Sequence, residues 1–243
     1  RMILEAVYEP VFSNYSHGFR PGRSCHTALA QLKHEFIGAS WFVEGDIKGC
    51  FDNIDHTVLI AVIGRKIKDA RFLKLIRLFL KSGYMEDWKY YGTYSGCPQG
   101  GIISPILANI YLNEFDQEYE KRGVKFVRYA DDIVLLAKSD RGAKRLLETS
   151  TKYLEGTLKL KVNQEKSREV SVFAIRNFKF LGFTLGKNRK GIYIRVHGKS
   201  WKKMKSKLKE LSSRRSVQSI RPSLEKIRVF MRGWLNYYGI ADM

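Results

Sequence analysis

Hydrophobic and polar positions follow two different periods along this chain, and the period indicates which segments form helices and which form strands. Apolar residues recur at helical spacing in eight segments: 2–12, 24–37, 56–67, 71–81, 104–121, 141–156, 200–213 and 223–238. Short runs rich in β-branched and aromatic residues predict strands at 41–47, 89–94, 125–129, 133–137, near 160, at 178–183 and at 192–196. This order predicts an α+β fold followed by a helical appendage.

Individual residues mark several of the expected element ends. Ser24 is a suitable cap for the second helix, and Pro105 suits the first turn of the helix that begins at Ser104. The segment 96–101 is too rich in glycine and proline for regular structure. In this prediction, Arg221-Pro222 separates the last two helices.

Three carboxylates fall at the ends of predicted strands. Asp46 closes the strand that begins at Trp41, and Asp131 and Asp132 occupy the tip between two apolar strands. A pair of aspartates is by itself typical of a solvated turn. Here the flanking strands are apolar, and clustered charge beside a core is costly unless a cation compensates it.

If these strands are neighbours in one sheet, their ends bring Asp46, Asp131 and Asp132 together. Magnesium prefers hard, anionic oxygen ligands and keeps several waters, so two or three carboxylates are enough to hold it. Phosphoryl transfer to a nucleotide uses two such cations, about 3.5–4 Å apart. The three aspartates are therefore candidate metal ligands.

The chain is strongly basic, and the excess charge is unevenly distributed. Of the 243 residues, 44 are Lys or Arg and 24 are Asp or Glu, which gives a net charge of +20. The segment 186–243 holds 16 of these basic residues and three acidic ones. A localised basic face beside a more neutral core is expected for contact with a phosphate backbone. The alternative is a soluble basic protein without a polyanionic partner.

Lysines crowd the helix expected at 200–213, where they alternate with an apolar stripe. The stripe consists of Trp201, Met204, Leu208 and Leu211. The candidates for RNA contact on this helix are Lys202, Lys203, Lys205 and Lys209. A solvated face that binds nothing is the alternative.

The cysteines and the hydropathy pattern exclude other classes of protein. Cys25, Cys50 and Cys97 are odd in number and far apart, which argues against a disulfide framework and a zinc site. No apolar run reaches about 18 residues and no signal peptide is visible, so we expect no membrane partner. The sequence begins inside an apparent helix, and we expect the natural protein to begin earlier.

Six blocks resemble, in the same order, those of the reverse transcriptases that group II introns encode. The most specific is Tyr129-Ala130-Asp131-Asp132, which is similar to the Y-A-D-D box of that family and follows F-V-R at 126–128. The others are 17–24 (H-G-F-R-P-G-R-S), 42–52 (F-V-E-G-D-I-K-G-C-F-D), 96–105 (G-C-P-Q-G-G-I-I-S-P), 160–167 (L-K-V-N-Q-E-K-S) and 180–183 (F-L-G-F). A further segment, R-G-W-L-N-Y-Y at 232–238, is similar to the thumb, or maturase X region, of the same proteins.

The resemblance implies a right-hand polymerase. We expect partial fingers at 1–40, a palm at 41–190 with the finger-side segment 56–90 inserted, and the thumb or the start of the maturase X region at 191–243. The palm would be an antiparallel sheet with packed helices. The family's fingers carry a basic block further upstream, so we expect this stretch alone to be poorly active.

The resemblance also assigns the candidate catalytic residues. Asp46 and Asp131 would be the principal ligands of two Mg2+ ions, for which Mn2+ can substitute. The backbone carbonyl of Ile47 would assist them, and Asp132 would be the supporting third carboxylate.

Further roles are implied for nucleotide and RNA contacts. Phe51 would lie beneath the sugar and exclude a 2′-hydroxyl, with a core phenylalanine as the alternative. Gln99, beside Gly100, would contact the incoming nucleotide. Lys166 would neutralise the triphosphate or protonate the leaving pyrophosphate, with a surface lysine as the alternative. The RNA-contact candidates outside the lysine-rich helix are Arg20, Arg23 and Arg232; for the first two a structural role is equally consistent.

The expected function is RNA-directed DNA polymerisation together with binding of intron RNA as a splicing maturase. The expected partners are the intron RNA, an RNA template with a DNA primer, and dNTPs, with the oligomeric state open and a dimer compatible. One alternative is a non-catalytic RNA-binding splicing cofactor that keeps the fold. Another is a retron or diversity-generating reverse transcriptase. The expected location is the bacterial cytoplasm, or an organelle for a relative.

Overall fold

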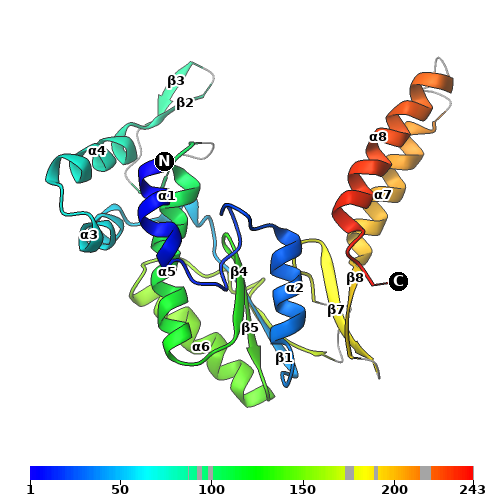
Figure 1. Ribbon diagram of the computed structural model, residues 1–243, viewed down its shortest axis with the longest axis horizontal. Helices are drawn as coiled ribbons and strands as arrows, with labels where there is room; N and C mark the ends of the chain where they lie inside the picture. The colour runs from blue at the N-terminus through cyan, green and yellow to red at the C-terminus, as the bar shows by residue number, and fades with distance from the viewer. Residues whose placement is uncertain are drawn as a thin grey trace. The chain divides into compact units, whose positions relative to one another are not determined.

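The computed structural model describes residues 1–86, 88–91, 95–97, 101–172, 178–188, 191–213 and 220–242. The chain forms two compact units, Arg1–Glu169 and Val170–Met243 (Figure 1). Their boundary falls inside the segment 41–190 that we expect to be the palm. The division into fingers, palm and thumb therefore stays a prediction.

A four-stranded sheet lies at the centre of the first unit. Its strands have the spatial order β4 (Phe126–Tyr129), β5 (Asp132–Ala137), β1 (Trp41–Asp46) and β6 (Arg168–Ser171), the last of which crosses the unit boundary. Strand β5 is antiparallel to both β4 and β1. All of β5 after Asp132 is buried, as its apolar sequence predicts. The predicted α+β fold with an antiparallel sheet is confirmed.

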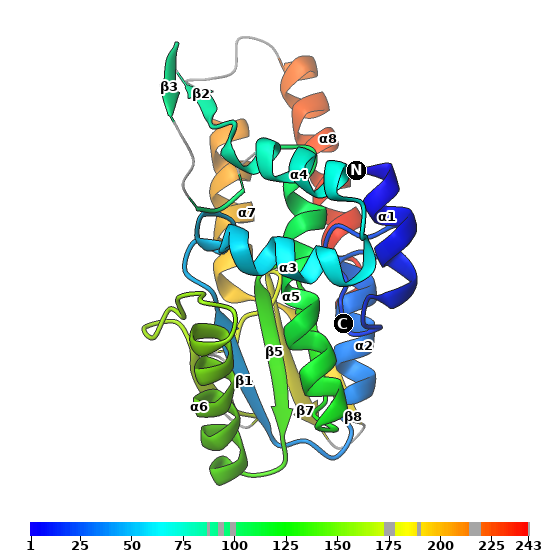
Figure 2. The same ribbon diagram turned by 90° about the vertical axis from the view of Figure 1, so that its left-hand side faces the viewer.

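The first unit also contains helices and one small hairpin. The elements are α1 (Met2–Tyr8), the 3-10 helix η1 (Glu9–Val11), α2 (Cys25–Glu35), the 3-10 helix η2 (Phe51–Asn53), α3 (His56–Lys66), α4 (Ala70–Lys81), β2 (Tyr84–Glu86), β3 (Lys89–Tyr91), α5 (Ser104–Lys121) and α6 (Asp140–Gly156). Helix α6 packs along β1 and β5, and α2 packs along β4 (Figures 1 and 2).

Short-range side-chain contacts fix where the helices begin. Ser24 and Thr27 form a reciprocal capping box at the start of α2, and the Asp55 carboxylate accepts two backbone N–H groups at the start of α3. Pro105 lies in the first turn of α5. The capping side chains accept hydrogen bonds from backbone N–H groups that have no partner within the helix, and the proline has no N–H to satisfy. The predicted roles of Ser24 and Pro105 are therefore confirmed.

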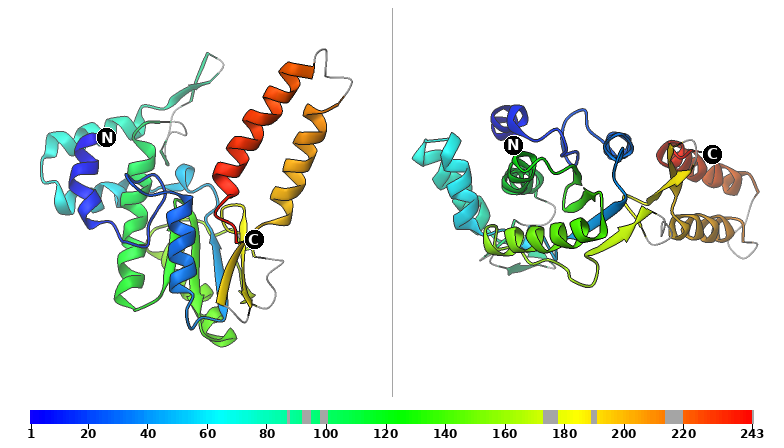
Figure 3. Two further views of the ribbon diagram at one scale, coloured as in Figure 1. Left: turned by 45° about the vertical axis from the view of Figure 1, so that its right-hand side comes forward. Right: turned by 90° about the horizontal axis from the view of Figure 1, so that it is seen from below.

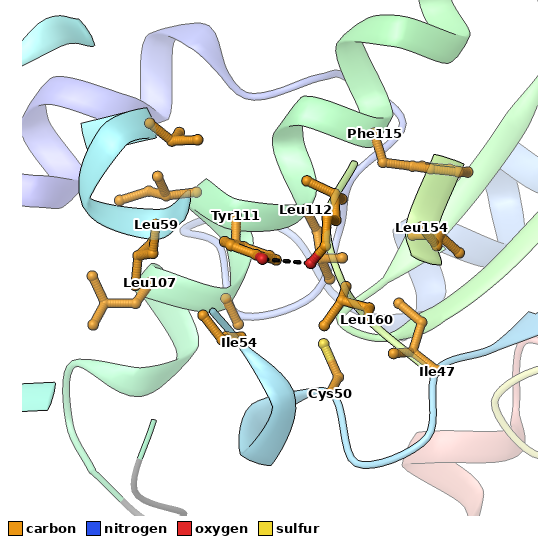
Figure 4. Close-up of a cluster of buried hydrophobic side chains, with 14 of the residues drawn as sticks. Ile47, Cys50, Ile54, Leu59, Leu107, Tyr111, Leu112, Phe115, Leu154 and Leu160 are labelled. Atoms are coloured by element: carbon orange, nitrogen blue, oxygen red, sulfur yellow. Dashed lines mark hydrogen bonds between the residues drawn. The ribbon is translucent and has the colours of Figure 1, made fainter. Parts of the chain in front are cut away.

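One hydrophobic cluster fills the first unit. Figure 4 shows that Ile47 and Cys50, which follow β1, contribute to it together with Tyr111 of α5 and Leu160. The Tyr111 hydroxyl donates a hydrogen bond of 2.5 Å to the carbonyl of Leu158, which satisfies the polar atom of a fully buried side chain. Close packing of this kind resists displacement. The buried side chains of Ile47 and Cys50 therefore fix the position of the segment that follows Asp46.

The second unit combines a hairpin with a pair of helices. Its elements are β7 (Phe183–Asn188), β8 (Gly191–Val196), α7 (Gly198–Leu211) and α8 (Ile220–Tyr238). Helices α7 and α8 run side by side (Figure 3), and the rings of Trp201 and Trp234 lie 5.0 Å apart between them. Neither these two helices nor any other helix in the described ranges is long and apolar enough to cross a membrane.

Some expected elements differ in the structure. The strand expected near Leu160 is an isolated bridge between Val162 and Ile47, and the strand predicted at 178–183 is wrong because β7 begins at Phe183. Strand β6 was not expected. Pro222 lies within α8 and does not separate two helices. The last three residues of the strand predicted at 89–94 lie outside the described residues.

Candidate active site

The register of the sheet brings two of the three predicted aspartates opposite each other. Asp46 of β1 pairs with Asp132 of β5, and Tyr129 of β4 pairs with Asp132 from the other side. Residues directly opposite in an antiparallel pair point to the same face, with Cβ atoms about 4.5–5.5 Å apart. The Asp46 and Asp132 side chains therefore leave the sheet on one face, and Asp131 lies beside them at the hairpin tip.

Residues far along the chain anchor Asp46. The N–H of Asn163 donates to the Asp46 carbonyl at 2.9 Å, and the Asp46 N–H donates to Oγ of Ser167 at 3.2 Å. The Lys166 ammonium lies 3.3 Å from Oδ2 of Asp46. The structure thus brings the predicted nucleotide-binding lysine to a predicted metal ligand.

Backbone hydrogen bonds determine which way the Ile47 carbonyl points. Asp46 and Lys48 both bond to the segment 161–163. Successive residues of an extended strand direct their backbone polar groups to opposite edges. The Ile47 carbonyl therefore points to the other edge, toward the strand that carries Asp132, while the Ile47 side chain is buried in the core.

Electrostatics link Asp131 to the segment after β1. Burial raises the pKa of the Cys50 thiol to about 12, and the nearby Asp131 carboxylate adds to this rise while the Arg128 guanidinium opposes it. Burial likewise raises the pKa of Cys97 to about 12. Both thiols stay protonated at neutral pH, so neither cysteine offers an anionic sulfur to a metal ion here.

Phe51 is half-buried, and both its backbone and its ring make contacts. The Cys97 N–H donates to the backbone carbonyl of Phe51 at 2.6 Å, and the Phe51 and Phe19 rings form a T-shaped pair at a centroid distance of 6.4 Å. Gly96 has a φ of +82°, and a Cβ there would come 2.5 Å from the Phe51 carbonyl oxygen. Glycine is therefore required for the backbone at Gly96 to pack so closely against Phe51.

Two predicted nucleotide-binding residues, Gln99 and Gly100, lie outside the described residues. Cys97 before them and Ser104 after them are both buried. The roles of Gln99 and Gly100 stay predictions.

The predicted metal ligands suit magnesium by their chemistry. The carboxylates of Asp46, Asp131 and Asp132, together with the carbonyl of Ile47, offer only hard oxygen donors. Across the stretches of chain that the structure describes, no three or more His, Cys, Asp or Glu side chains gather into a metal-holding group. The fit therefore rests on donor type and strand register.

The two arginines of the 17–24 block are engaged within the first unit. The Arg20 guanidinium, whose side chain is 4% exposed, pairs with Glu9 at 2.8 Å and donates to two backbone carbonyls. Arg23 bonds to the carbonyl and the side chain of Asn14 and is partly exposed. A phosphate would have to displace these contacts to reach Arg20, so its position favours the structural alternative.

Burial of His17 in the same block predicts a dependence of stability on pH. Its Nδ1 lies 2.9 Å from Thr27 Oγ1, and its Nε2 lies 2.7 Å from Gln31 Oε1. Burial lowers the pKa of His17 to about 4, from 6.5 in the unfolded chain. Between these values the unfolded chain binds a proton that the folded chain does not, so the free energy of unfolding falls as the pH falls.

We expect this loss to reach about 2 kcal/mol between pH 7 and pH 5, as measured by urea denaturation. The variant His17→Gln should lose this part of the pH dependence. The control His34→Gln changes a ring that is 79% exposed and should keep it. A His17→Gln variant with the wild-type slope would show that another group titrates.

The predicted RNA-contact residues of the second unit are open to solvent. The exposed residues are Lys202, Lys203, Lys205 and Lys209 of α7 and Arg232 of α8. Of the predicted apolar stripe, Met204 is buried and Leu208 and Leu211 are partly buried, whereas Trp201 is 41% exposed. The basic face of α7 is therefore accessible to a polyanion.

Sequence reasoning missed a buried ion pair next to the hairpin tip. Arg128 of β4 and Asp116 of α5 are both fully buried and pair at 2.5 Å. A signal was present, since Asn109, Asn113 and Asp116 recur at helical spacing within an otherwise apolar helix, and all three are buried. A buried polar stripe of this kind needs partners.

Comparisons with known proteins identify the family of this chain. Residues 1–185 match the family "Reverse transcriptase (RNA-dependent DNA polymerase)", and residues 201–243 match "Group II intron, maturase-specific domain". The group II intron-encoded protein LtrA of Lactococcus lactis is 37% identical over 95% of this chain and 47% of its own length. Protein YkfC of Escherichia coli is 33% identical over 77% of this chain and 59% of its own length.

The chain spans about half the length of the curated relatives it matches. Among solved structures, telomerase from Candida albicans, in complex with a fragment of telomeric RNA, superposes with a TM-score of 0.62. It is 14% identical, and the match covers 95% of this chain and 46% of the telomerase. At this identity the likeness concerns the fold alone.

Proposed function

This chain belongs to the reverse transcriptase family, in the branch that group II introns encode, and from that premise we propose that it extends a DNA primer on an RNA template. The observation that carries the proposal is the register of β1 and β5. It pairs Asp46 with Asp132 beside Asp131, at a point where Lys166 also lies. Carboxylates on adjacent strand ends are what a nucleotidyl-transfer centre requires.

In the proposed reaction, the primer 3′-hydroxyl attacks the α-phosphate of a dNTP, a new P–O bond forms, and pyrophosphate leaves. Asp46 and Asp131 would hold two Mg2+ ions, with Asp132 and the Ile47 carbonyl in support. When bound, these ions neutralise charge on the attacking and leaving oxygens. Phe51 would limit the space at the sugar 2′ position, and Lys166 would supply a positive charge to the departing phosphates.

The same family membership supports a second role for the other unit. We propose that α7 and α8 bind intron RNA and assist its splicing, since residues 201–243 match the maturase-specific domain. The exposed lysines of α7 suit backbone recognition, which weakens steeply with salt. Charge removal at Lys202 and Lys203 should therefore reduce both affinity and its salt dependence.

A primer-extension assay tests the polymerase proposal. The full chain is given an RNA template with an annealed DNA primer, dNTPs and Mg2+, and extension is followed on a gel, with EDTA as the control. We expect extension that EDTA abolishes. Intact RNA binding without extension would overturn the proposal and favour the non-catalytic splicing cofactor.

Replacement of Lys166 distinguishes a role at the phosphates of the nucleotide from that of an ordinary surface lysine. We expect Lys166→Gln to lower the rate of nucleotide addition by about 10–100-fold, because a positive charge beside the phosphates is lost. Stability should change by less than about 1 kcal/mol, because the side chain is 68% exposed and such ion pairs contribute little. The matched control is Lys161→Gln, which changes an exposed lysine of the same segment. Equal rates for the two variants would make Lys166 an ordinary surface lysine.

A further inference from the structure

The buried guanidinium of Arg128 contacts three residues, two on helix α5 and one at the hairpin tip. Its Nε and Nη2 donate to the Asp116 carboxylate of α5 at 2.8 and 2.5 Å. Its Nη1 donates to Oδ1 of Asn109 at 3.0 Å and to the backbone carbonyl of Ala130 at 2.9 Å. One rigid side chain thus joins α5 to the residue immediately before Asp131.

Asn109 extends these contacts to the 17–24 block. While its Oδ1 accepts from Arg128, its Nδ2 donates to the Gly18 carbonyl at 2.8 Å. A Cβ on Gly18 would come 2.3 Å from the Ala130 nitrogen, so these two backbone segments are in direct contact. Two contacts therefore support Ala130 at the hairpin tip: the hydrogen bond from Arg128 to its carbonyl and the close approach of the Gly18 backbone.

The tip needs such support because its backbone is strained. Ala130 has a φ of +56°, a left-handed conformation that costs a residue with a side chain about 1–2 kcal/mol. Asp131 follows directly, so any relaxation of Ala130 would move the Asp131 carboxylate. Observed strain of this kind is retained only where the surroundings determine it.

Stability does not explain why the ion pair is buried. Desolvation of two charges offsets their attraction, and apolar replacements of similar volume are often neutral or stabilising. We infer that Arg128, through Asp116 and Asn109, is a positioning residue that sets the hairpin tip and thereby aims Asp131 at its metal. The expected change in polymerisation rate rests on the proposed polymerase function, whereas the expected change in metal affinity does not.

The test removes the ion pair without leaving a buried charge. The double variant Arg128→Met/Asp116→Leu replaces both partners by apolar residues of similar size. The matched control is Arg65→Met/Glu114→Leu, which removes a pair of 2.5 Å between α3 and the same helix α5. Thermal unfolding, Mn2+ binding by calorimetry without substrate, and primer extension as a function of Mg2+ are measured for each.

We expect the double variant to unfold within a few degrees of the wild type and to bind the primer–template with a KM changed less than about threefold. Its Mn2+ affinity should fall about tenfold, and the Mg2+ concentration for half-maximal rate should rise in parallel, as is typical when supports of metal ligands are lost. Its kcat should fall about 100-fold, because small misplacements of reacting groups are costly. The control should match the wild type in all three measurements.

A folded double variant with wild-type Mn2+ affinity and kcat would overturn the inference. If the double variant does not fold, the variant Asn109→Leu tests the inference instead, because it keeps the ion pair and removes the hydrogen bonds to Arg128 and Gly18. We then expect the Mn2+ affinity to fall about threefold or more. An unchanged Mn2+ affinity would equally overturn the inference. Failure of the proposed function is a different result. In that case the wild type would not extend primers at all, while the difference in Mn2+ affinity would remain.

Discussion

Replacing Asp131 by asparagine should lower primer extension by about 10³-fold or more while leaving the fold and RNA binding unchanged. Asparagine keeps the shape of the side chain but removes the negative charge that a divalent cation requires. Ala130, the other residue of the loop, has no carboxylate, and the adjacent Asp132 already has the supporting role in our proposal. Single-turnover extension with saturating primer–template and dNTPs measures the loss.

The ranking of the two adjacent aspartates is part of this prediction. Asp132→Asn should cost about tenfold, because Asp132 is the supporting carboxylate in our proposal. The matched control is Asp140→Asn at the start of α6, where the carboxylate pairs with Lys144 at 2.7 Å, beyond the end of β5 that lies away from the tip. We expect Asp140→Asn to extend primers like the wild type. Equal losses for Asp131→Asn and Asp132→Asn would contradict the ranking.

Much of the first unit was predictable because its local signals agree with its tertiary contacts. The apolar runs on either side of Asp131 are both buried strands, and they pair in the hairpin that their spacing predicts. Ser24 caps α2, and Pro105 begins α5, as their backbone preferences require. Such elements can be predicted from the sequence because their local preferences agree with the contacts of the folded chain.

Other features depend on contacts that no local pattern encodes. Phe178 and Phe180 are buried side chains outside any strand, and their apolar spacing imitates one. The buried partner of Arg128 lies twelve positions earlier in the chain, on a different element. The polar stripe of α5 indicates that Asp116 needs a partner, but only the folded chain shows that this partner is Arg128. Burial of Arg20 likewise depends on Glu9 and on carbonyls that only the folded chain brings near.

The position of Asp46 shows the same limit within the candidate site. Its place at the end of β1 was predictable from the sequence, whereas the role of Lys166 came from the family resemblance and stays a prediction. That Ser167 holds the Asp46 N–H, and that Asn163 holds its carbonyl, follows only from the bridge between Ile47 and Val162. No periodic pattern of apolar and polar residues indicates backbone pairing between segments so far apart in the chain.

Replacing Phe51 by alanine should let the protein incorporate ribonucleotides about 100-fold more readily relative to deoxyribonucleotides. The Cys97 N–H holds the backbone carbonyl of Phe51, and the ring itself makes a T-shaped contact with the ring of Phe19. In the proposed site this ring fills the space that a 2′-hydroxyl would need, and loss of steric exclusion of one small group changes discrimination by this order. Extension with each rNTP, compared with its dNTP by kcat/KM, measures the change.

The matched control for Phe51→Ala is Phe72→Ala in α4, because both rings are partly buried and pack against the same hydrophobic cluster. We expect both variants to lose stability by a similar amount, since each leaves a gap at the edge of that cluster. Only Phe51→Ala should change sugar selection, because selection depends on where the ring lies and not on how much apolar surface it buries. Unchanged exclusion of rNTPs by a folded Phe51→Ala variant would instead make Phe51 a core residue.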